Sequence, residues 1–109
     1  MLDRLFCYGT LRDPAVIAAL LGRVPQSGPA VLPAHRRSRL ADRPWVGVAP
    51  AAGSAVEGVL YGGLSERELG WLDRYEGADY RRTTVRLTIG VAARLGWIYL
   101  PRRALAATP

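Results

Sequence analysis

The chain has 109 residues, is 50% hydrophobic, and carries 15 Lys+Arg against 9 Asp+Glu, which gives a net charge of +6 at pH 7. Its only cysteine, Cys7, excludes an internal disulfide and a Cys/His zinc motif. The longest apolar run, Pro14–Leu21, is too short to span a bilayer, and the opening residues lack the apolar region of a signal peptide. We therefore expect one cytoplasmic domain over residues 1–109, with a core at about 4–100 and a tail of little pattern at 101–109.

The chain is predicted to begin with a short strand and a helix. Leu5–Tyr8 is an apolar run that stops at Gly9, as a buried strand does before a turn. Asp13 is a suitable N-cap for a helix over Pro14–Leu21, with proline at the first helical position. Gly22 then provides the left-handed cap that ends this helix.

Five further strands are predicted from hydrophobic alternation and from the turn residues between them. They are Ala30–Leu40, Trp45–Ala49, Ala55–Tyr61, Thr83–Ile89 and Trp97–Leu100, with a turn at Pro50–Ser54. About six strands and two short helices indicate an α+β domain whose sheet curls into a small mixed β-barrel.

The second helix is marked by signals at both ends. Ser65 and Glu68 form a capping box, in which each side chain accepts from the other residue's backbone N–H. The helix is predicted to run to about Glu76 and to end at Gly77 in a left-handed cap.

Glu76 is the unusual residue of this helix. Leu69, Leu72 and Glu76 are spaced i, i+3, i+7 and share one face, so leucines that point to the core direct Glu76 there too. Glu76 also lies in the last turn, where the helix dipole disfavours a carboxylate. Both effects raise its pKa toward the range of a general acid or base. The alternative is a structural salt bridge with Arg82 or Arg74.

The second candidate feature is the turn of Tyr8, Gly9, Thr10 and Leu11. Gly9 can adopt backbone angles closed to other residues and lets a ligand approach the main chain. The amides that follow it, just before a helix, can bind a carboxylate or an oxyanion. Taken alone, a Gly-Thr turn after a strand is most simply just a turn.

These two features occur together in a known family. The sequence resembles gamma-glutamylcyclotransferase-like proteins, a group that includes gamma-glutamylamine cyclotransferases and avirulence-induced-gene-like proteins. The resemblance rests on Leu5–Arg12, Leu20–Arg23, Val56–Tyr61 and Leu72–Gly77, with Tyr80 and Arg82. It covers most of residues 4–100 in the same order. The chain departs from the family at Cys7, where an aliphatic residue is more usual, and over Arg43–Val48, where the pattern fits loosely.

The resemblance implies a barrel with a cavity at one end, in which Glu76 is catalytic. It implies that the turn Tyr8–Leu11 binds the glutamyl part of a small-molecule gamma-glutamyl substrate, with Tyr80 and Arg82 also in the binding site. The implied reaction releases 5-oxoproline and a free amine, because the substrate's alpha-amine attacks its own gamma-carbonyl while Glu76 moves the proton. The reaction needs no metal or organic cofactor and no membrane. We expect Arg43–Val48 to line the leaving-amine side.

The alternative is a non-catalytic binding module of the same fold, which would use its basic face for an acidic partner or nucleic acid. We expect Arg36, Arg37 and Arg39 to form an exposed face, and Trp45, Trp71 and Trp97 to fill the core rather than stack on nucleobases. This makes nucleic acid the less favoured partner. The sequence leaves the oligomeric state and the identity of the leaving amine open.

A few arginines, such as Arg82 and Arg12, are expected to attract or orient a substrate that carries its own carboxylate. Neutralising Arg82 is expected to raise the Michaelis constant for gamma-glutamyl substrates. Neutralising Arg103, in the tail, is expected to leave it unchanged.

Overall fold

The computed structural model describes residues 1–106, so the part of the predicted tail at 107–109 lies outside the described residues. The elements in chain order are β1 (Leu5–Cys7), η1 (Thr10–Arg12), α1 (Pro14–Leu21), β2 (Ser27–Leu40), β3 (Arg43–Tyr61), α2 (Glu66–Glu76), η2 (Gly77–Asp79), β4 (Tyr80–Ile89) and β5 (Ala92–Pro101). The strands close a barrel in the order β1-β3-β2-β4-β5. Strands β1 and β5 are parallel and the other neighbours are antiparallel, which confirms the mixed barrel.

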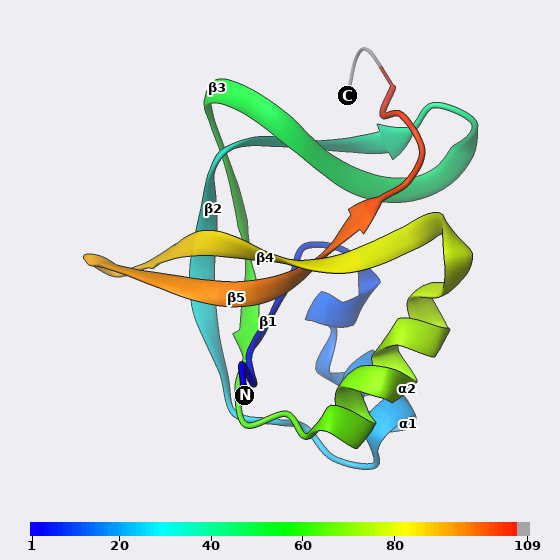
Figure 1. Ribbon diagram of the computed structural model, residues 1–109, viewed down its shortest axis with the longest axis vertical. Helices are drawn as coiled ribbons and strands as arrows, with labels where there is room; N and C mark the ends of the chain where they lie inside the picture. The colour runs from blue at the N-terminus through cyan, green and yellow to red at the C-terminus, as the bar shows by residue number, and fades with distance from the viewer. Residues whose placement is uncertain (107–109) are drawn as a thin grey trace.

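The barrel has five strands rather than about six, because β3 unites the strands predicted at 45–49 and 55–61. The turn predicted at Pro50–Ser54 is therefore wrong. This segment lies opposite Ala34 of β2, which has a φ of 58°, and the register of the two strands shifts here. A bulge of this kind bends a strand pair without ending it. Figure 1 shows the β2–β3 hairpin bending from an upright lower part into an upper part that crosses the top of the molecule.

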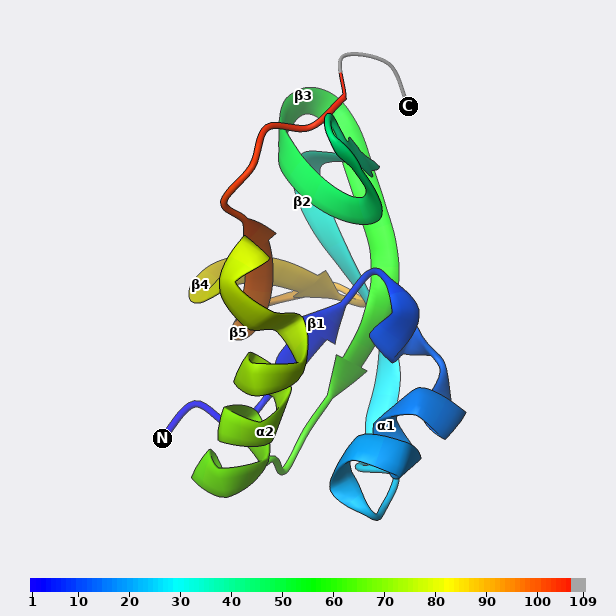
Figure 2. The same ribbon diagram turned by 90° about the vertical axis from the view of Figure 1, so that its right-hand side faces the viewer.

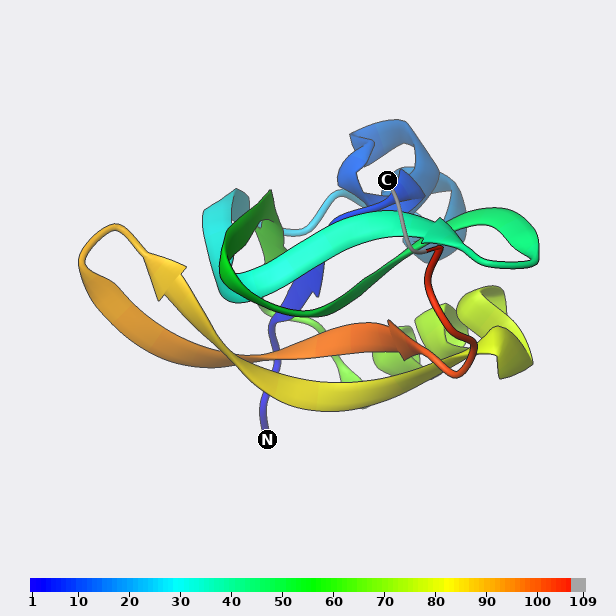
Figure 3. The same cartoon turned by 90° about the horizontal axis from the view of Figure 1, so that it is seen from above.

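The two hairpins, β2–β3 and β4–β5, form two layers with β1 between them, as the view from above shows (Figure 3). Both faces of β1 are buried as a result. Leu5 and Cys7 pack in one core cluster with residues of α1 and α2, whereas Phe6 and Tyr8 pack in a second cluster inside the barrel. Strand β1 thus carries the turn that follows it into the middle of the domain.

Both helices lie at the same end of the barrel, on either side of β1 (Figure 2). Their predicted starts are confirmed: the Asp13 side chain accepts from the Ala15 N–H, and both bonds of the α2 capping box are formed. Gly22 has the predicted left-handed conformation, with φ 76° and ψ 7°. Within the described residues, neither helix is long and apolar enough to cross a membrane.

The end of α2 differs from the prediction. Gly77 has φ 71° and ψ −163°, so it adopts an extended conformation with positive φ instead of the left-handed helical one. This region is open almost only to glycine. The chain passes directly into η2 and then into β4 at Tyr80. Glu76 and Tyr80 are therefore held at the same corner of the barrel.

The tail is more structured than the sequence indicates. Leu105 forms an antiparallel bridge with Leu40, and the Ala41 N–H donates to the Ala104 carbonyl at 2.9 Å. Residues 104–106 consequently lie against the end of β2 and the turn that follows it, whereas the Arg102 N–H donates to the Asp79 carbonyl at 2.8 Å.

Two of the three tryptophans do not fill the core. The exposed fractions of Trp45 and Trp71 are 51% and 36%, whereas Trp97 packs against the helix-side cluster. Hydrophobicity alone places such a ring in the core, but it does not specify which strand or helix face the ring occupies.

Candidate active site

A cavity of about 600 Å³ opens where β1, α2 and the start of β3 meet. It is lined by Phe6, Cys7, Tyr8, Gly9, Thr10, Leu11, Pro44, Trp45, Val46, Tyr75, Glu76, Gly77, Ala78, Asp79, Tyr80 and Tyr99. This volume lies in the range of small-molecule sites. The cavity brings together every predicted site residue except Arg82, and it includes three residues of the loosely matching segment Arg43–Val48.

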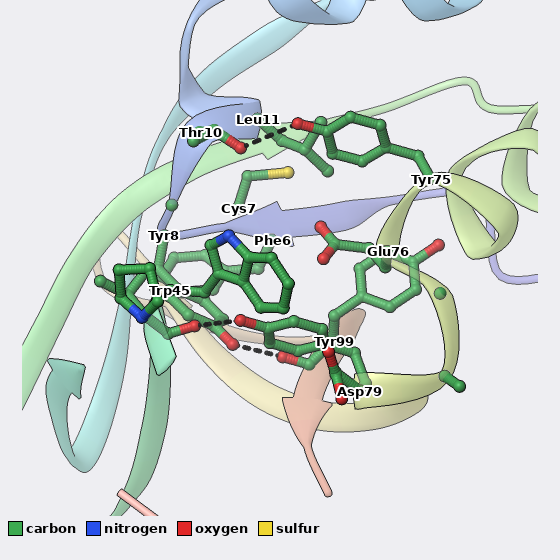
Figure 4. Close-up of a pocket in the computed structure, with 16 residues that line it drawn as sticks. Phe6, Cys7, Tyr8, Thr10, Leu11, Trp45, Tyr75, Glu76, Asp79 and Tyr99 are labelled. Carbon is green, nitrogen blue, oxygen red and sulfur yellow. Dashed lines mark hydrogen bonds between the residues drawn. The ribbon is translucent and has the colours of Figure 1, made fainter. Parts of the chain in front are cut away.

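Glu76 reaches the cavity from the last turn of α2. Leu69 and Leu72 are 2% and 0% exposed, so the predicted shared face is confirmed, and Glu76 continues that face toward the cavity. Figure 4 shows its carboxylate pointing inward, toward the side of the cavity where Cys7 and Trp45 lie.

The Glu76 carboxylate has no hydrogen-bond or ion-pair partner among residues 1–106. The alternative salt bridge is not formed, since Arg82 binds Asp73 instead. Burial without a compensating partner raises the pKa of Glu76 from 4.5 to about 7. Near neutral pH the residue can therefore take up a proton and give it back.

Neighbouring groups remain protonated under the same conditions. Burial, followed by the charge of Glu76, raises the pKa of Tyr80 to about 12. The same two causes raise the pKa of the Cys7 thiol, which is only 3% exposed. A thiol in such surroundings is a poor nucleophile, because the thiolate is the reactive form. Glu76 is thus the lining group with the properties of an acid–base catalyst.

The turn after β1 is fixed by three long-range hydrogen bonds. The Tyr8 hydroxyl donates to the Tyr99 carbonyl at 2.5 Å, and the Tyr61 hydroxyl donates to the Leu11 carbonyl at 2.8 Å. Arg37, expected on an exposed face, donates through Nη1 to the Tyr8 carbonyl at 2.9 Å. These contacts hold the main chain of the turn at the cavity wall.

Gly9 and Thr10 line the cavity, Gly9 facing β3 and Thr10 facing α2. A Cβ atom at Gly9 would lie 3.2 Å from Val46 Cγ2, so a side chain here would press on the opposite wall. The Thr10 Oγ1 and the Tyr75 hydroxyl are joined by a 3.2 Å hydrogen bond, drawn as a dashed line in Figure 4. This bond links the turn to the helix that carries Glu76.

Tyr80 and Tyr99 line the cavity, but their hydroxyls are already engaged as donors. The Tyr80 hydroxyl donates to the Val46 carbonyl at 2.6 Å and so joins the start of β4 to β3. The Tyr99 hydroxyl donates to Asp73 Oδ1 at 2.6 Å.

Arg82 lies outside the cavity lining. Its guanidinium binds both oxygens of Asp73, at 2.7 and 3.1 Å, and lies over the ring of Trp97 at 4.3 Å from the centroid. Asp73 in turn accepts from Tyr99. Any influence of Arg82 on the cavity therefore passes through Asp73 and Tyr99.

Sequence reasoning missed Asp73, Tyr75 and Asp79. Asp73 lies three residues before Glu76 on the helix, and this spacing is the signal that was available for it. Tyr75 directly precedes Glu76, and neighbouring residues do not share a helix face, so spacing gives no signal for it. Asp79 has no local signal, because its place at the cavity comes from the unusual conformation of Gly77. No cluster of three His, Cys, Asp or Glu side chains suited to a metal ion occurs in the described part of the chain.

A family model described as "Gamma-glutamyl cyclotransferase, AIG2-like" matches residues 5–108. The chain belongs to this family. AIG2-like proteins C and A of Arabidopsis thaliana are each 38% identical to it, over 85 and 84 residues that cover 78% and 77% of the chain. The chain spans about half the length of these relatives, 49% and 51%.

Two solved structures share the fold. A solution structure of an Arabidopsis thaliana protein superposes with a TM-score of 0.85 at 30% identity, over 97% of this chain and 72% of that one. A structure named gamma-glutamyl cyclotransferase superposes with a TM-score of 0.83 at 16% identity, over 94% of this chain and 68% of that one. At that identity the second likeness shows the fold alone.

Proposed function

We propose that this member of the AIG2-like family is a gamma-glutamyl cyclotransferase that cleaves a gamma-glutamyl amide. The alpha-amine of the glutamyl group attacks its own gamma-carbonyl, forming the C–N bond of a five-membered ring. The amide C–N bond then breaks, and the products are 5-oxoproline and a free amine. The stoichiometry of this reaction includes no water and no cofactor, because the nucleophile and the electrophile belong to one molecule.

The observation that carries this proposal is the unpartnered Glu76 with a pKa of about 7. The alpha-amine must lose one proton as it attacks, and the leaving nitrogen must gain one as it departs. A single carboxyl group whose pKa lies near neutrality can accept the first proton and donate it to the second site. The cavity must hold the glutamyl chain folded, which provides the proximity advantage of an intramolecular reaction.

The turn at Gly9–Leu11 is proposed to bind the charged end of the glutamyl group. The two charged residues that line the cavity, Glu76 and Asp79, are both acids. Main-chain amides at the start of η1 are therefore the donors proposed for the alpha-carboxylate or the developing oxyanion. The bonds from Tyr61 and Arg37 that fix this turn support such a role, since an anion site built from the main chain requires a rigid backbone.

The direct test is release of 5-oxoproline from a series of gamma-glutamyl amides, measured with the purified chain. Stoichiometric release of 5-oxoproline and free amine is expected from at least one of them. Hydrolysis to glutamate, or no reaction with any of the series, would contradict the proposal.

The pH dependence of kcat/KM is expected to show one acid limb. Glu76 must be deprotonated in the free enzyme to accept the amine's proton, and its pKa is about 7. The rate constant should therefore rise about tenfold per pH unit below 7 and level off above it. An acid limb centred near 4.5, the ordinary value for glutamate, would show that burial does not tune this group.

Replacing Arg82 with glutamine is expected to raise KM about 3–10-fold and to change kcat less, because Tyr99 loses the anchored Asp73 that positions it. The matched control is Arg94→Gln, since Arg94 is exposed on β5 and, within residues 1–106, its side chain bonds only to the Ala93 carbonyl. Arg103, the contrast suggested by the sequence, binds cavity-lining Asp79 at 2.8 Å and is unsuitable as a control. Equal KM values for both variants would contradict a role for the Arg82 network.

A further inference from the structure

Two arginines bind the main chain of the turn after β1 without lining the cavity beside Glu76. Arg37 of β2 donates through Nη1 to the Tyr8 carbonyl at 2.9 Å. Arg12 donates to the Gly9 carbonyl twice, through its main-chain N–H at 3.1 Å and through Nε at 3.0 Å. The two peptide groups that flank Gly9 therefore each hold a guanidinium at the carbonyl oxygen.

Neither of these two arginines is paired with an acid. Their guanidinium groups form no ion pair within residues 1–106, in contrast to that of Arg82, which binds Asp73. The carbonyl oxygens that they bind are neutral, so the positive charges stay uncompensated. These charges are also permanent, because arginine does not lose its proton in proteins. The turn thus has two fixed positive charges on its carbonyls.

Each peptide group transmits the effect of this charge to its N–H. Every peptide bond among residues 1–106 is trans, so a carbonyl and the N–H of the same peptide point in opposite directions. The Tyr8 carbonyl lies opposite the Gly9 N–H, and the Gly9 carbonyl lies opposite the Thr10 N–H. A cation bonded to the oxygen polarises the peptide and makes its N–H a stronger donor. Neither N–H has an acceptor among residues 1–106, so both are open to a ligand.

The cavity lining itself offers no positive side chain to an anion. Within residues 1–106 it includes no arginine, and its two charged members, Glu76 and Asp79, are acids. Figure 4 shows Tyr8 and Thr10 on one side of the cavity and Glu76 on the other. A carboxylate held at the turn is therefore repelled by Glu76 whenever that group is ionised. Positive charge bonded to the turn offsets this repulsion.

We propose that Arg12 and Arg37 are positioning residues that make the turn selective for a carboxylate. They act through the two peptide groups that flank Gly9, and neither side chain touches the substrate. This inference rests on the proposed function and deepens it, because it names the residues that supply positive charge to a binding site built from main chain. The expected attraction between Arg12 and the substrate's carboxylate thus passes through the Gly9 carbonyl.

The test uses two small ligands that differ in charge. 5-Oxoproline keeps the alpha-carboxylate of the glutamyl group, and its primary amide, 5-oxoprolinamide, has a neutral group of similar shape in the same place. Titration of the purified chain at about pH 6, where Glu76 is mainly protonated, measures both Kd values. 5-Oxoproline is expected to bind about tenfold or more tightly than the amide. Equal affinities, or no binding of 5-oxoproline, would overturn the inference.

Variants then locate the source of this preference. Arg12→Gln and Arg37→Gln are each expected to lower the preference about 3–10-fold and to change the Kd of 5-oxoprolinamide less than about twofold. Arg37→Lys keeps the charge and should retain most of the preference. The matched control is Arg39→Gln, which should retain all of it. Arg39 is exposed two residues further along β2, and its side chain has no bond within residues 1–106.

A structural role and a charge effect give different results. Equal weakening of both ligands in Arg12→Gln and Arg37→Gln would mean that the arginines only maintain the shape of the turn. The same loss of preference in Arg39→Gln would mean that any charge on the strand suffices. Either result overturns the inference, and the proposed function stands if gamma-glutamyl amides still release 5-oxoproline. Absence of that release would overturn the proposed function and the inference with it.

Discussion

Replacing Glu76 with glutamine is expected to lower the rate of 5-oxoproline release by about 10²–10⁴-fold while the barrel stays folded. Glutamine keeps the shape of the side chain but can neither accept the amine's proton nor return it to the leaving nitrogen. The measurement is kcat with a saturating gamma-glutamyl amide. Unchanged turnover would remove Glu76 from the mechanism. Glu66→Gln, in the exposed first turn of the same helix, is the matched control and should keep full activity.

The same variant should become more stable as it loses activity. The pKa of Glu76 is raised by folding from 4.5 to about 7, so the folded state holds a proton that the unfolded chain releases in this interval. The stability of the natural protein therefore falls as pH rises from 4.5 through 7. Glutamine does not titrate, so the melting temperature of Glu76→Gln should exceed that of the natural protein at pH 8. The two should converge below pH 4.5. Equal melting temperatures at pH 8 would mean that burial of the ionised Glu76 carboxylate does not destabilise the folded protein.

Replacing Gly58 with alanine is expected to destabilise the fold by about 3 kcal/mol, at the upper end of overpacking effects. A Cβ atom at Gly58 in β3 would collide with the Cys7 carbonyl and lie 2.7 Å from Phe6 Cζ. The first contact is with backbone of β1, which cannot rotate away as a side chain can. Chemical denaturation measures the free energy of unfolding directly.

Gly28→Ala is the control for this substitution. Gly28 also lies in a strand, and a Cβ atom there meets no atom within 4 Å. Alanine at this position should be neutral or stabilise slightly, because it lowers the entropy of the unfolded chain. Similar losses of stability in the two variants would show that strand glycines matter here for conformation rather than for close packing.

The helices were predictable because their signals are local. The Asp13 cap and the capping box of Ser65 and Glu68 join residues only two or three positions apart, so the local sequence is enough to indicate them. The full length of strand β3 could not be predicted in this way, since its continuity through Pro50–Ser54 depends on the bulge opposite Ala34 in another strand. Turn-forming residues indicate a bend, but whether the bend ends the pairing is decided by the partner.

The candidate site divides in the same way. Glu76 was identified from helical spacing, because a helix fixes the direction of each side chain relative to the next. Trp45 was predicted to lie in the core, but it is half-exposed and lines the cavity. Asp79 and its partner Arg103 come from segments that meet only in the folded barrel, so no pattern along the chain connects them.

Closure of the barrel by β1 and β5 also determines when the site can exist during folding. The Trp97 N–H donates to the Arg4 carbonyl at 2.9 Å, and the Trp97 indole donates to the Leu2 carbonyl at 2.8 Å, so the two ends of the chain complete the sheet together. Pairings between such distant residues form slowly, because a long loop must close first. During synthesis on the ribosome, the cavity beside the turn after β1 could not be completed until β5, which contributes Tyr99 to its lining, had been synthesised. A nascent chain shorter than that could already contain Glu76, but it would lack the completed cavity around it.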